Sequence, residues 1–172
     1  MSFHAAAGSN PFVPDETNTR QLRDAFGRFA TGVTIVTAAT ADGVAAITAN
    51  SFSSVSLSPP LVLWSPDRNS RRFRYFESAD AYAIHVLAAD QGDLCWDVAR
   101  DVFALNDRGL LANAEGVPVL ENCLARFECT KKAVYEGGDH VIMLGQVNRA
   151  AMRDEGDPLA FYKGQMGRFA AH

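Results

Sequence analysis

The sequence predicts a mainly β protein, folded as an antiparallel barrel or sandwich with a few peripheral helices. Segments with the apolar patterns of strands dominate the chain, and the connections between them are short. Helical spacing is recognisable at only three places. Parallel α/β sheets alternate strands with crossover helices, and this chain lacks that alternation. The 172 residues suit a single domain with its own core.

The first expected elements are an arm and a helix. Residues 1–16 are small, polar and proline-containing, so we expect a flexible N-terminal arm, followed by one domain over residues 17–172. The helix is indicated by apolar residues that fall on one helical face: Leu22, Ala25, Phe26 and Phe29. Asn18 and Gln21 are placed as its capping pair, and Gly32 is expected to end it.

A hairpin and a buried strand follow the helix. Residues 33–39 and 44–49 have the composition of strands, and the Asp42-Gly43 dipeptide between them is a strong two-residue turn signal. A proline pair then interrupts the chain. Residues 61–65 after it are predicted to form a buried strand.

The middle of the chain combines two short helices with a strand. The first helix is expected to start near Asn69 and to bury Phe73 and Phe76, and residues 82–87 form the strand. Asp90 is placed to cap the second helix. The apolar residues of that helix are Leu94, Trp96 and Val98.

A long hairpin is predicted for the last third of the chain. Residues 101–121 have no regular pattern and are expected to be irregular. Residues 123–135 and 140–153 then form the two arms of the hairpin, joined by the glycine-containing turn EGGD. A short strand and a turn at Gly164 complete the tail.

Composition excludes several classes of function. The net charge of −4 argues against a nucleic-acid surface, which needs a basic patch. No apolar run approaches the roughly 20 residues that span a bilayer, and the N-terminus lacks the pattern of a signal peptide, so we expect a cytoplasmic protein without a membrane partner. Three cysteines without CxxC spacing suggest neither a disulfide framework nor a zinc site, and Cys123 and Cys129, which have apolar strand neighbours, are expected to be buried, inert thiols.

The common cofactor motifs are missing from the sequence. There is no GxGxxG, GxxxxGK[ST] or GxSxG, and the four histidines show no HExxH spacing. No metal site is therefore predicted. A phosphate-bearing ligand would have to be held by hydroxyls, turn amides and arginine side chains.

The segment TANSFSSVSLSPP (residues 48–60) mixes hydroxyl groups with apolar residues. Thr48 is expected to point away from the core, and Phe52, Val55 and Leu57 are assigned mainly to the barrel interior. The polar residues along the bending edge are Asn50, Ser51, Ser53 and Ser54. They could hydrogen-bond a planar heterocycle, each bond contributing about 1 kcal/mol. The alternative is structural, with the hydroxyls satisfying a β-bulge or cross-strand pairs.

The segment SPDRNSRRFR (residues 65–74) combines turn residues with four arginines. Asp67, Asn69 and Ser70 are typical of a turn and a helix N-terminus. Helix amides and guanidinium groups together make an anion site, in which each charge-assisted bond contributes roughly 1.5–3 kcal/mol. The alternative is a solvated basic face.

The segment EGGDH (residues 136–140) places a histidine directly after a glycine turn. His140 is a polar group that would point to a ligand lying across the barrel mouth. The alternative is that it merely begins a strand.

Taken together, these segments resemble one family. The flavin reductase-like proteins are small NAD(P)H:flavin oxidoreductases that commonly serve two-component monooxygenases. The matching blocks, in the family's order and spacing, are TGVTIVTA (31–38), TANSFSSVSLSPPLVL (48–63), SPDRNS (65–70), GGDHVIMLGQV (137–147) and DPLAFYKGQMGRF (157–169). The resemblance covers roughly residues 20–169.

The resemblance implies a fold and an activity. The fold is a split β-barrel with Greek-key topology over residues 17–172, usually a homodimer, with FMN or FAD in a groove near the subunit interface. The activity is hydride transfer from NADH or NADPH to the flavin, which supplies a partner monooxygenase. Two alternatives stay open: a flavin-dependent reductase of a metal acceptor such as a ferric chelate or a corrinoid, and a flavin-binding module without catalysis.

The resemblance also implies site residues. The flavin ring is bordered by Thr31, Gly32, Val33, Thr48, Ala49, Asn50, Ser51 and Ser54. The flavin phosphate is held by Ser65, Asp67, Arg68, Asn69 and Ser70. His140 lies near the nicotinamide and positions it, and Tyr162 of the aromatic tail closes over the ring. The family often has Asn where this chain has His85.

Overall fold

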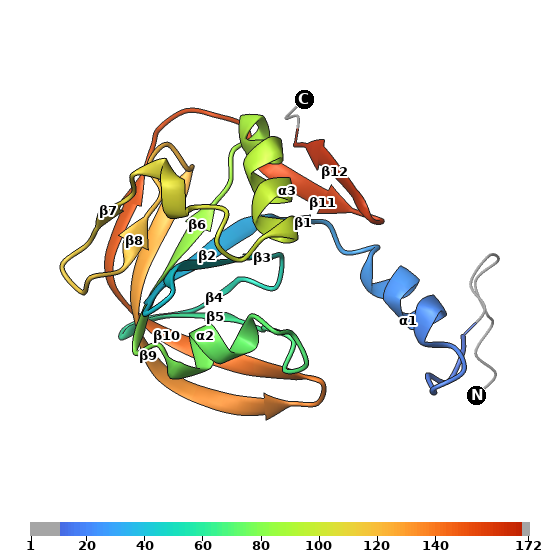
Figure 1. The fold of residues 1–172 in the computed structure, drawn as a ribbon. Helices are drawn as coiled ribbons and strands as arrows, with labels where there is room; N and C mark the ends of the chain where they lie inside the picture. Colours follow the sequence, from blue (N-terminus) through green and yellow to red (C-terminus); the bar gives the residue numbers. More distant parts are fainter. Residues whose placement is uncertain (1–10, 170–172) are drawn as a thin grey trace.

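The computed structural model describes residues 11–169, which fold mainly as β-strands (Figure 1). The seven-stranded sheet of these residues contains β2 (Thr34–Thr40), β3 (Gly43–Ala49), β4 (Ser53–Leu57), β5 (Pro60–Trp64), β6 (Ala81–Val86), β9 (Ala125–Gly137) and β10 (His140–Met152). A three-stranded sheet contains β1 (Thr31–Gly32), β11 (Leu159–Tyr162) and β12 (Gln165–Arg168). A small pair is formed by β7 (Leu111–Ala112) and β8 (Pro118–Val119).

The helices are short and lie outside the sheet (Figure 1). The α-helices are α1 (Thr19–Phe26), α2 (Phe73–Ser78) and α3 (Gly92–Arg100). Two single 3₁₀ turns are η1 (Ala89–Gln91) and η2 (Asn106–Arg108). Among the described residues, no helix is both long enough and apolar enough to cross a bilayer.

The large sheet closes on itself except at one gap. Its strand order is β3-β2-β6-β9-β10-β5-β4, so β3 and β4 are the two edge strands. These edges are joined in sequence by residues 50–52 alone, a link that spans roughly 14 Å at most. The two edges must therefore face each other, which makes the sheet a split barrel. The predicted fold class is confirmed, and the gap lies at the segment that begins TANSFSS.

The strand connections follow Greek-key topology. The chain passes from β5 through α2 to β6, but β9 and β10 lie between these two strands in the sheet. The strands β6, β9 and β10 are neighbours in sequence order, and β5, which precedes them in the chain, lies beside the last of them. This is the Greek-key order read in the reverse direction. The two predicted hairpins are also confirmed, at the Thr40–Gly43 turn and between β9 and β10. Gly43 has φ of 123°, a conformation that glycine adopts without a steric penalty.

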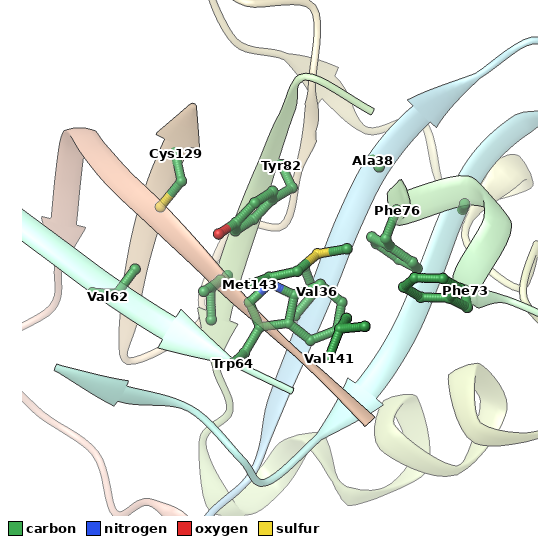
Figure 2. Close-up of a cluster of buried hydrophobic side chains, with 12 residues drawn as sticks. Val36, Ala38, Val62, Trp64, Phe73, Phe76, Tyr82, Cys129, Val141 and Met143 are labelled. Atoms are coloured by element: carbon green, nitrogen blue, oxygen red, sulfur yellow. The ribbon is translucent and has the colours of Figure 1, made fainter. Parts of the chain in front are cut away.

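The barrel interior is filled by aromatic and branched side chains (Figure 2). Trp64, Phe76 and Tyr82 are fully buried, and the Trp64 ring meets the other two edge-on at centroid distances of 5.2 and 5.9 Å. Burying each such ring contributes roughly 2–3 kcal/mol to folding. Phe73 and Phe76 cover this core from α2, as the sequence predicted.

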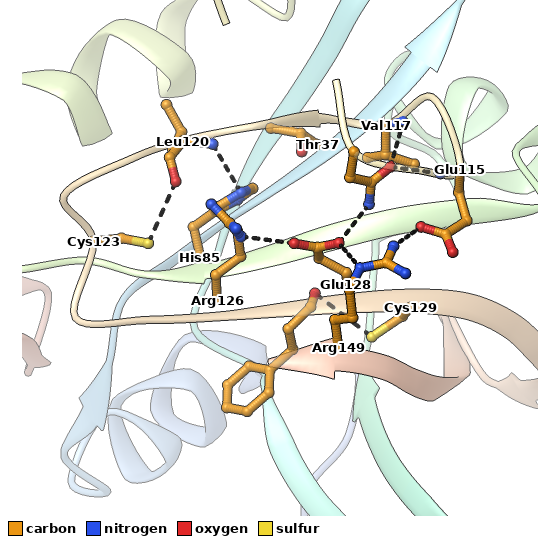
Figure 3. A network of polar contacts seen from close by, with 12 residues as sticks. Thr37, His85, Glu115, Val117, Leu120, Cys123, Arg126, Glu128, Cys129 and Arg149 are labelled. Atoms are coloured by element: carbon orange, nitrogen blue, oxygen red, sulfur yellow. Dashed lines mark hydrogen bonds and ion pairs between the residues drawn. The ribbon is translucent and has the colours of Figure 1, made fainter. Parts of the chain in front are cut away.

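A polar network ties the segment between α3 and β9 to the barrel wall (Figure 3). The buried Glu128 carboxylate accepts bonds from Arg126 (3.0 Å), Arg149 (2.7 Å) and Asn113 (3.0 Å), and Arg149 also pairs with Glu115. Burial disfavours the charge, yet the bonds from Arg149 and Asn113 and the nearby Arg126 hold the pKa of Glu128 below its ordinary value.

The α1 region differs from the sequence prediction. The helix ends at Phe26, capped by Gly27, and Gly32 lies in β1 instead of ending the helix. Asn18 does not cap the helix with its side chain, because its amide bonds back to residues 13 and 15. The apolar face is not covered within the described chain, since Phe26 is 68% exposed and Phe29 is 77% exposed.

Other boundaries and burial assignments also needed correction. Val55 and Leu57 are exposed, because β4 is an edge strand and its outward side chains meet no second layer. Asp90 lies in the 3₁₀ turn before α3 and does not cap that helix. The segment 101–121 is less irregular than expected, with one 3₁₀ turn and the β7–β8 pair. The three cysteines are buried free thiols, as predicted for Cys123 and Cys129.

Candidate functional site

The split in the barrel carries a small cavity of about 160 Å³. Its walls come from the ends of β2, β3 and the small C-terminal sheet, and the lining residues are Val33, Thr48, Ala49, Asn50, Phe161 and Met166. Hairpin pairing of β2 with β3 brings the two predicted segments together, with Thr34 opposite Ala49. The Thr48 hydroxyl donates to the Cys95 carbonyl at 3.1 Å, which anchors this wall to α3.

A larger cleft of about 450 Å³ adjoins this cavity. Asn50 and Phe161 line both, and Thr31 lines the larger one. The Thr31 hydroxyl oxygen is buried and has no hydrogen-bond partner among the described residues. Gly32 is exposed, and a Cβ placed on it would have open space within 4 Å. The two spaces lie on the β3 side of the gap, and both include Asn50 of the link between the edge strands.

The turn after β5 borders the same gap. The Ser51 hydroxyl oxygen accepts from the Ser65 amide at 2.9 Å and donates to the Ser65 carbonyl at 3.3 Å, which joins the β3–β4 link to this turn. The Asp67 carboxylate accepts from the Asn69 amide at 2.8 Å, and the Ser70 amide donates to the Asp67 carbonyl at 3.1 Å. These bonds fix a compact turn in which Asp67, Arg68 and Asn69 are exposed.

The β9–β10 turn is bonded to the turn after β5. Asp67 and His140 form a bridge, and the Arg68 amide donates to the Asp139 carbonyl at 2.9 Å. The Arg68 guanidinium pairs with Glu136 at 2.5 Å. Two segments more than sixty residues apart in sequence therefore form one structural unit.

His140 is held by its neighbour. Its Nδ1 is 2.8 Å from the Asp139 carboxylate, and because that carboxylate only accepts, Nδ1 carries the proton. This bond to His140, helped by the charges of His140 and Arg23, lowers the pKa of Asp139 below its ordinary value. The His140 side chain is 46% exposed, and its Nε2 forms no hydrogen bond with the described residues.

Two predicted site residues stand apart from the cavities. Ser54 is exposed on β4 and lines neither of them. Tyr162 is 44% exposed and also lines neither, with the Lys163 ammonium 5.3 Å from its ring centroid. Its neighbour Phe161 lines both spaces. This difference is expected because successive side chains of a strand point to opposite faces.

The four arginines predicted as one cluster are divided among different contacts. Arg72 donates to the Val98 and Ala99 carbonyls at 2.5 and 2.8 Å, where it binds the end of α3. Arg74 donates to the Tyr75 hydroxyl at 2.6 Å and lies over its ring. Only Arg68 belongs to the turn that borders the gap. In residues 11–169 no cluster of three or more metal-binding side chains is present.

Sequence patterns did not reveal the residues of α1 and of the β11–β12 turn that line the larger cleft. They include Arg23, Arg28 and Lys163. The Lys163 amide donates to the Gly27 carbonyl at 2.9 Å, so these segments meet through a long-range main-chain bond. No local pattern signals such a bond. The only sequence feature that could have indicated these residues is the basic character of the segment around TGV (residues 31–33).

The split barrel, with two cavities on the β3 side of its gap and a polar turn beside it, is the architecture expected of a flavin reductase-like protein. The family model described as the flavin reductase like domain matches residues 26–170. The chain therefore belongs to this family.

Curated relatives support the assignment. The chain is 52% identical to the FMN reductase (NADH) SmoA of Agrobacterium fabrum over 159 residues, covering 92% of this chain and 91% of the relative. It is 34% identical to the flavin-dependent monooxygenase reductase subunit HsaB of Rhodococcus jostii, covering 92% and 82% of the two chains.

A solved structure has the same fold. The NADH:FAD oxidoreductase SgcE6 of Streptomyces globisporus, in complex with NAD and FAD fragments, superimposes with a TM-score of 0.84. It is 35% identical in sequence, and the match covers 93% of this chain and 98% of that one.

Proposed function

We propose that this protein is an NADH:flavin oxidoreductase that reduces FMN or FAD and supplies reduced flavin to a partner monooxygenase. The main support is the 52% identity to an NADH-dependent FMN reductase over nearly the full length of both chains. The relative named as a monooxygenase reductase subunit supports the role of the partner. Residues 17–172 would form the reductase domain. The proposed arm, residues 1–16, lies mostly outside the described residues.

The residues around the gap fit a flavin. A ring system would lie against Val33, Thr48 and Ala49, where one wall is apolar and the neighbouring Asn50 side chain is exposed. The unpartnered Thr31 hydroxyl supplies a hydrogen-bonding group that the chain itself does not use. The remaining proposed contacts of the ring are Gly32, Ser51 and Ser54.

The flavin phosphate would be held by the turn after β5. Proposed contacts are Ser65, Asp67, Arg68, Asn69 and Ser70. The Arg68 guanidinium supplies the positive charge, and the exposed turn supplies main-chain amides. Asp67 contributes indirectly, because its carboxylate is already bonded to the Asn69 amide and shapes the turn.

Hydride transfer from the nicotinamide C4 to the flavin N5 is chemistry that the two ligands supply. The chain's task is to stack the rings and hold them in line. We assign His140 to positioning of the nicotinamide, since Asp139 fixes its Nδ1 and Nε2 would then be the ring atom that bonds the ligand. Tyr162 would close over the rings only after a movement, because it lines neither cavity.

The quaternary state and location are further parts of the proposal. A homodimer is supported by exposed apolar side chains on the edge strand β4, with Val55 48% and Leu57 96% exposed. A cytoplasmic location is supported by three buried free cysteines, which suit a reducing compartment.

A steady-state assay of NADH oxidation tests the function. FMN, FAD and ferric chelates are compared as acceptors, with NADPH as the alternative donor. Rapid oxidation with free flavins supports the proposal. Oxidation that needs a ferric acceptor, or tight flavin binding without oxidation, would contradict it.

A further inference from the structure

Arg72, which directly precedes α2, joins that helix to the end of α3. Its guanidinium Nη1 and Nη2 donate to the carbonyls of Val98 and Ala99 at 2.5 and 2.8 Å. Both carbonyls lie in the last turn of α3, where an α-helix leaves its carbonyls without intrahelical partners. The positive charge also suits the negative end of the helix dipole. A planar guanidinium that meets two neighbouring carbonyls fixes direction as well as distance, so Arg72 forms a specific connection between the two helices.

The same residue closes the turn after β5. The Arg72 amide donates to the Ser70 hydroxyl oxygen at 3.3 Å, and the Phe73 amide donates to the Ser70 carbonyl at 3.0 Å. Ser70 is the last of the proposed phosphate contacts, so the end of this turn is bonded to the residue that holds α3. The start of the turn is held separately, by the bonds between Ser51 and Ser65.

α3 is also bonded to the wall proposed to contact the flavin ring. The Thr48 hydroxyl donates to the Cys95 carbonyl at 3.1 Å, and Cys95 and Val98 share a buried cluster with Ala46 of β3. One helical turn, about 5 Å along the axis, separates Cys95 from the carbonyls that Arg72 holds. α3 therefore links the ring wall to the phosphate turn, with Thr48 bonded at one point and Arg72 at the other.

The separation between the ring wall and the phosphate turn matters for a ligand that contacts both. In FMN and FAD the phosphate is joined covalently to the ring system, so the ring must meet the wall at Thr48 while the phosphate meets the turn at Ser70. A misplacement of about 1 Å would spoil the alignment of the charge-assisted bonds to the phosphate. Riboflavin has no phosphate and depends on the ring wall alone.

The other arginines of this segment do not make the connection to α3. Arg71 and Arg74 are exposed, and the Arg68 guanidinium pairs with Glu136. Arg71 therefore provides a matched control for Arg72, since it carries the same charge one position away.

We propose that Arg72 is a positioning residue for the flavin, which acts through α3 to hold the phosphate turn at a fixed distance from the ring wall. The inference rests on the proposed function for the flavin and for the two regions that contact it.

Fluorescence titration of the flavin-free protein with FMN and with riboflavin tests this role. Arg72→Gln should lower the ratio of FMN affinity to riboflavin affinity about fivefold. Arg71→Gln should change the same ratio by less than about twofold. A merely structural Arg72 would lower the free energy of unfolding and leave the ratio unchanged. An unchanged ratio in Arg72→Gln, or an equal fall in both variants, would overturn the proposal.

Arg72→Lys separates geometry from charge, and it is the milder variant to measure if Arg72→Gln does not fold. The ammonium keeps the positive charge but cannot meet both carbonyls with a planar pair of donors. The ratio of FMN to riboflavin affinity should therefore still fall. A ratio equal to that of the wild type would show that only the charge matters and would overturn the proposal.

A double-mutant cycle tests whether the effect passes through α3. Thr48→Val removes the bond to the Cys95 carbonyl at nearly constant volume. Any direct effect of Thr48 on the ring applies to FMN and riboflavin alike and cancels in the ratio of their affinities. Thr48→Val should therefore lower the ratio in the wild type and change it less in an Arg72→Gln background. Equal changes in both backgrounds would contradict a connection through α3.

The flavin titrations do not depend on catalysis. A wild-type protein that binds both flavins but fails to oxidise NADH would contradict the proposed function, while the ratio of affinities would still report on Arg72. Conversely, an active reductase with the same ratio in the wild type and in Arg72→Gln would contradict only the inference.

Discussion

The main-chain amide of Arg68 donates to the carbonyl of Asp139 at 2.9 Å, joining the turn after β5 to the turn between β9 and β10. The Val141 amide adds a second bond, to the Pro66 carbonyl at 3.1 Å. The proposed phosphate contact and the proposed nicotinamide contact therefore share one rigid support. A substitution on one turn should therefore also change the affinity for the ligand proposed to bind the other turn.

Glu136 is predicted to compete with the flavin phosphate. Its carboxylate holds the Arg68 guanidinium at 2.5 Å, the group proposed to bind that phosphate. Both side chains are exposed, so the pair is weak, and Glu136→Gln should tighten FMN binding by roughly two- to fivefold. Riboflavin has no phosphate, and its affinity should not change. Fluorescence quenching measures both.

A double-mutant cycle separates competition from general electrostatics. In an Arg68→Gln background, Glu136→Gln should no longer alter the FMN affinity, because the bond it releases is already absent. An equal gain in both backgrounds would show that Glu136 acts only through its charge. If Arg68→Gln itself leaves the ratio of FMN to riboflavin affinity unchanged, the phosphate assignment is wrong.

His140→Ala should raise the KM for NADH more than the KM for flavin. The loss of one hydrogen bond to the nicotinamide corresponds to roughly a five- to tenfold effect. Steady-state kinetics with each substrate varied in turn give the two values. An equal rise in both would count against the positioning role.

Asp139→Asn provides a milder form of the same test. The amide cannot match the carboxylate as an acceptor for the His140 Nδ1 proton, so the effect on NADH should be in the same direction and smaller. An unchanged KM for NADH in this variant would show that the Asp139 bond does not matter for binding.

Stability should fall between about pH 6.5 and pH 4 because of His85. Its Nδ1 lies 3.0 Å from the Ile35 carbonyl and its Nε2 accepts from the Leu120 amide at 3.1 Å, so the neutral ring is fully bonded. Burial lowers its pKa to about 4, although the Ile35 bond opposes this shift; Arg126 lowers the pKa slightly further, and Glu128 has a small opposing effect. The unfolded chain takes up the proton first, so acid favours unfolding by up to about 3 kcal/mol.

His85→Asn should remove this part of the pH dependence. Urea unfolding at several pH values between 4.5 and 7 gives the free energy of unfolding for both proteins. The variant should be less stable at pH 7, because its shorter amide cannot reach both partners, but its curve should be flatter. Parallel curves would show that another group is responsible.

The sequence predicted most strands because their burial follows local alternation. The hairpins at Asp42-Gly43 and at EGGD were predictable, since their turn residues have specific backbone preferences. The exposure of Leu57 was not predictable, because alternation does not say whether a strand lies at an edge. The end of α1 was misplaced for a similar reason: Phe29 continues the apolar pattern beyond the glycine that stops the helix.

The candidate site was predicted in part. The segments around Thr31, Thr48 and Asn50 meet because hairpin pairing of β2 and β3 is local. The contact between Gly27 and Lys163 joins residues that are 136 positions apart (163 − 27), and no periodicity signals it. The Glu128 network is also partly non-local, since Asn113 and Arg149 reach Glu128 from other segments and only Arg126 lies on the same strand.

Gly145→Ala should destabilise the barrel because Tyr82 occupies the space of its side chain. An added Cβ would overlap the Tyr82 hydroxyl and lie 3.0 Å from its Cζ and 3.1 Å from the Cys129 Cβ. Overpacking of this kind costs roughly 1–3 kcal/mol. The Tyr82 hydroxyl is buried without a partner among the described residues, so Tyr82→Phe alone should be nearly neutral. In the double variant, removing that hydroxyl should recover much of the loss caused by Gly145→Ala, as measured by urea unfolding. Strictly additive effects would show that the clash is relieved elsewhere, through movement of β10 against β9.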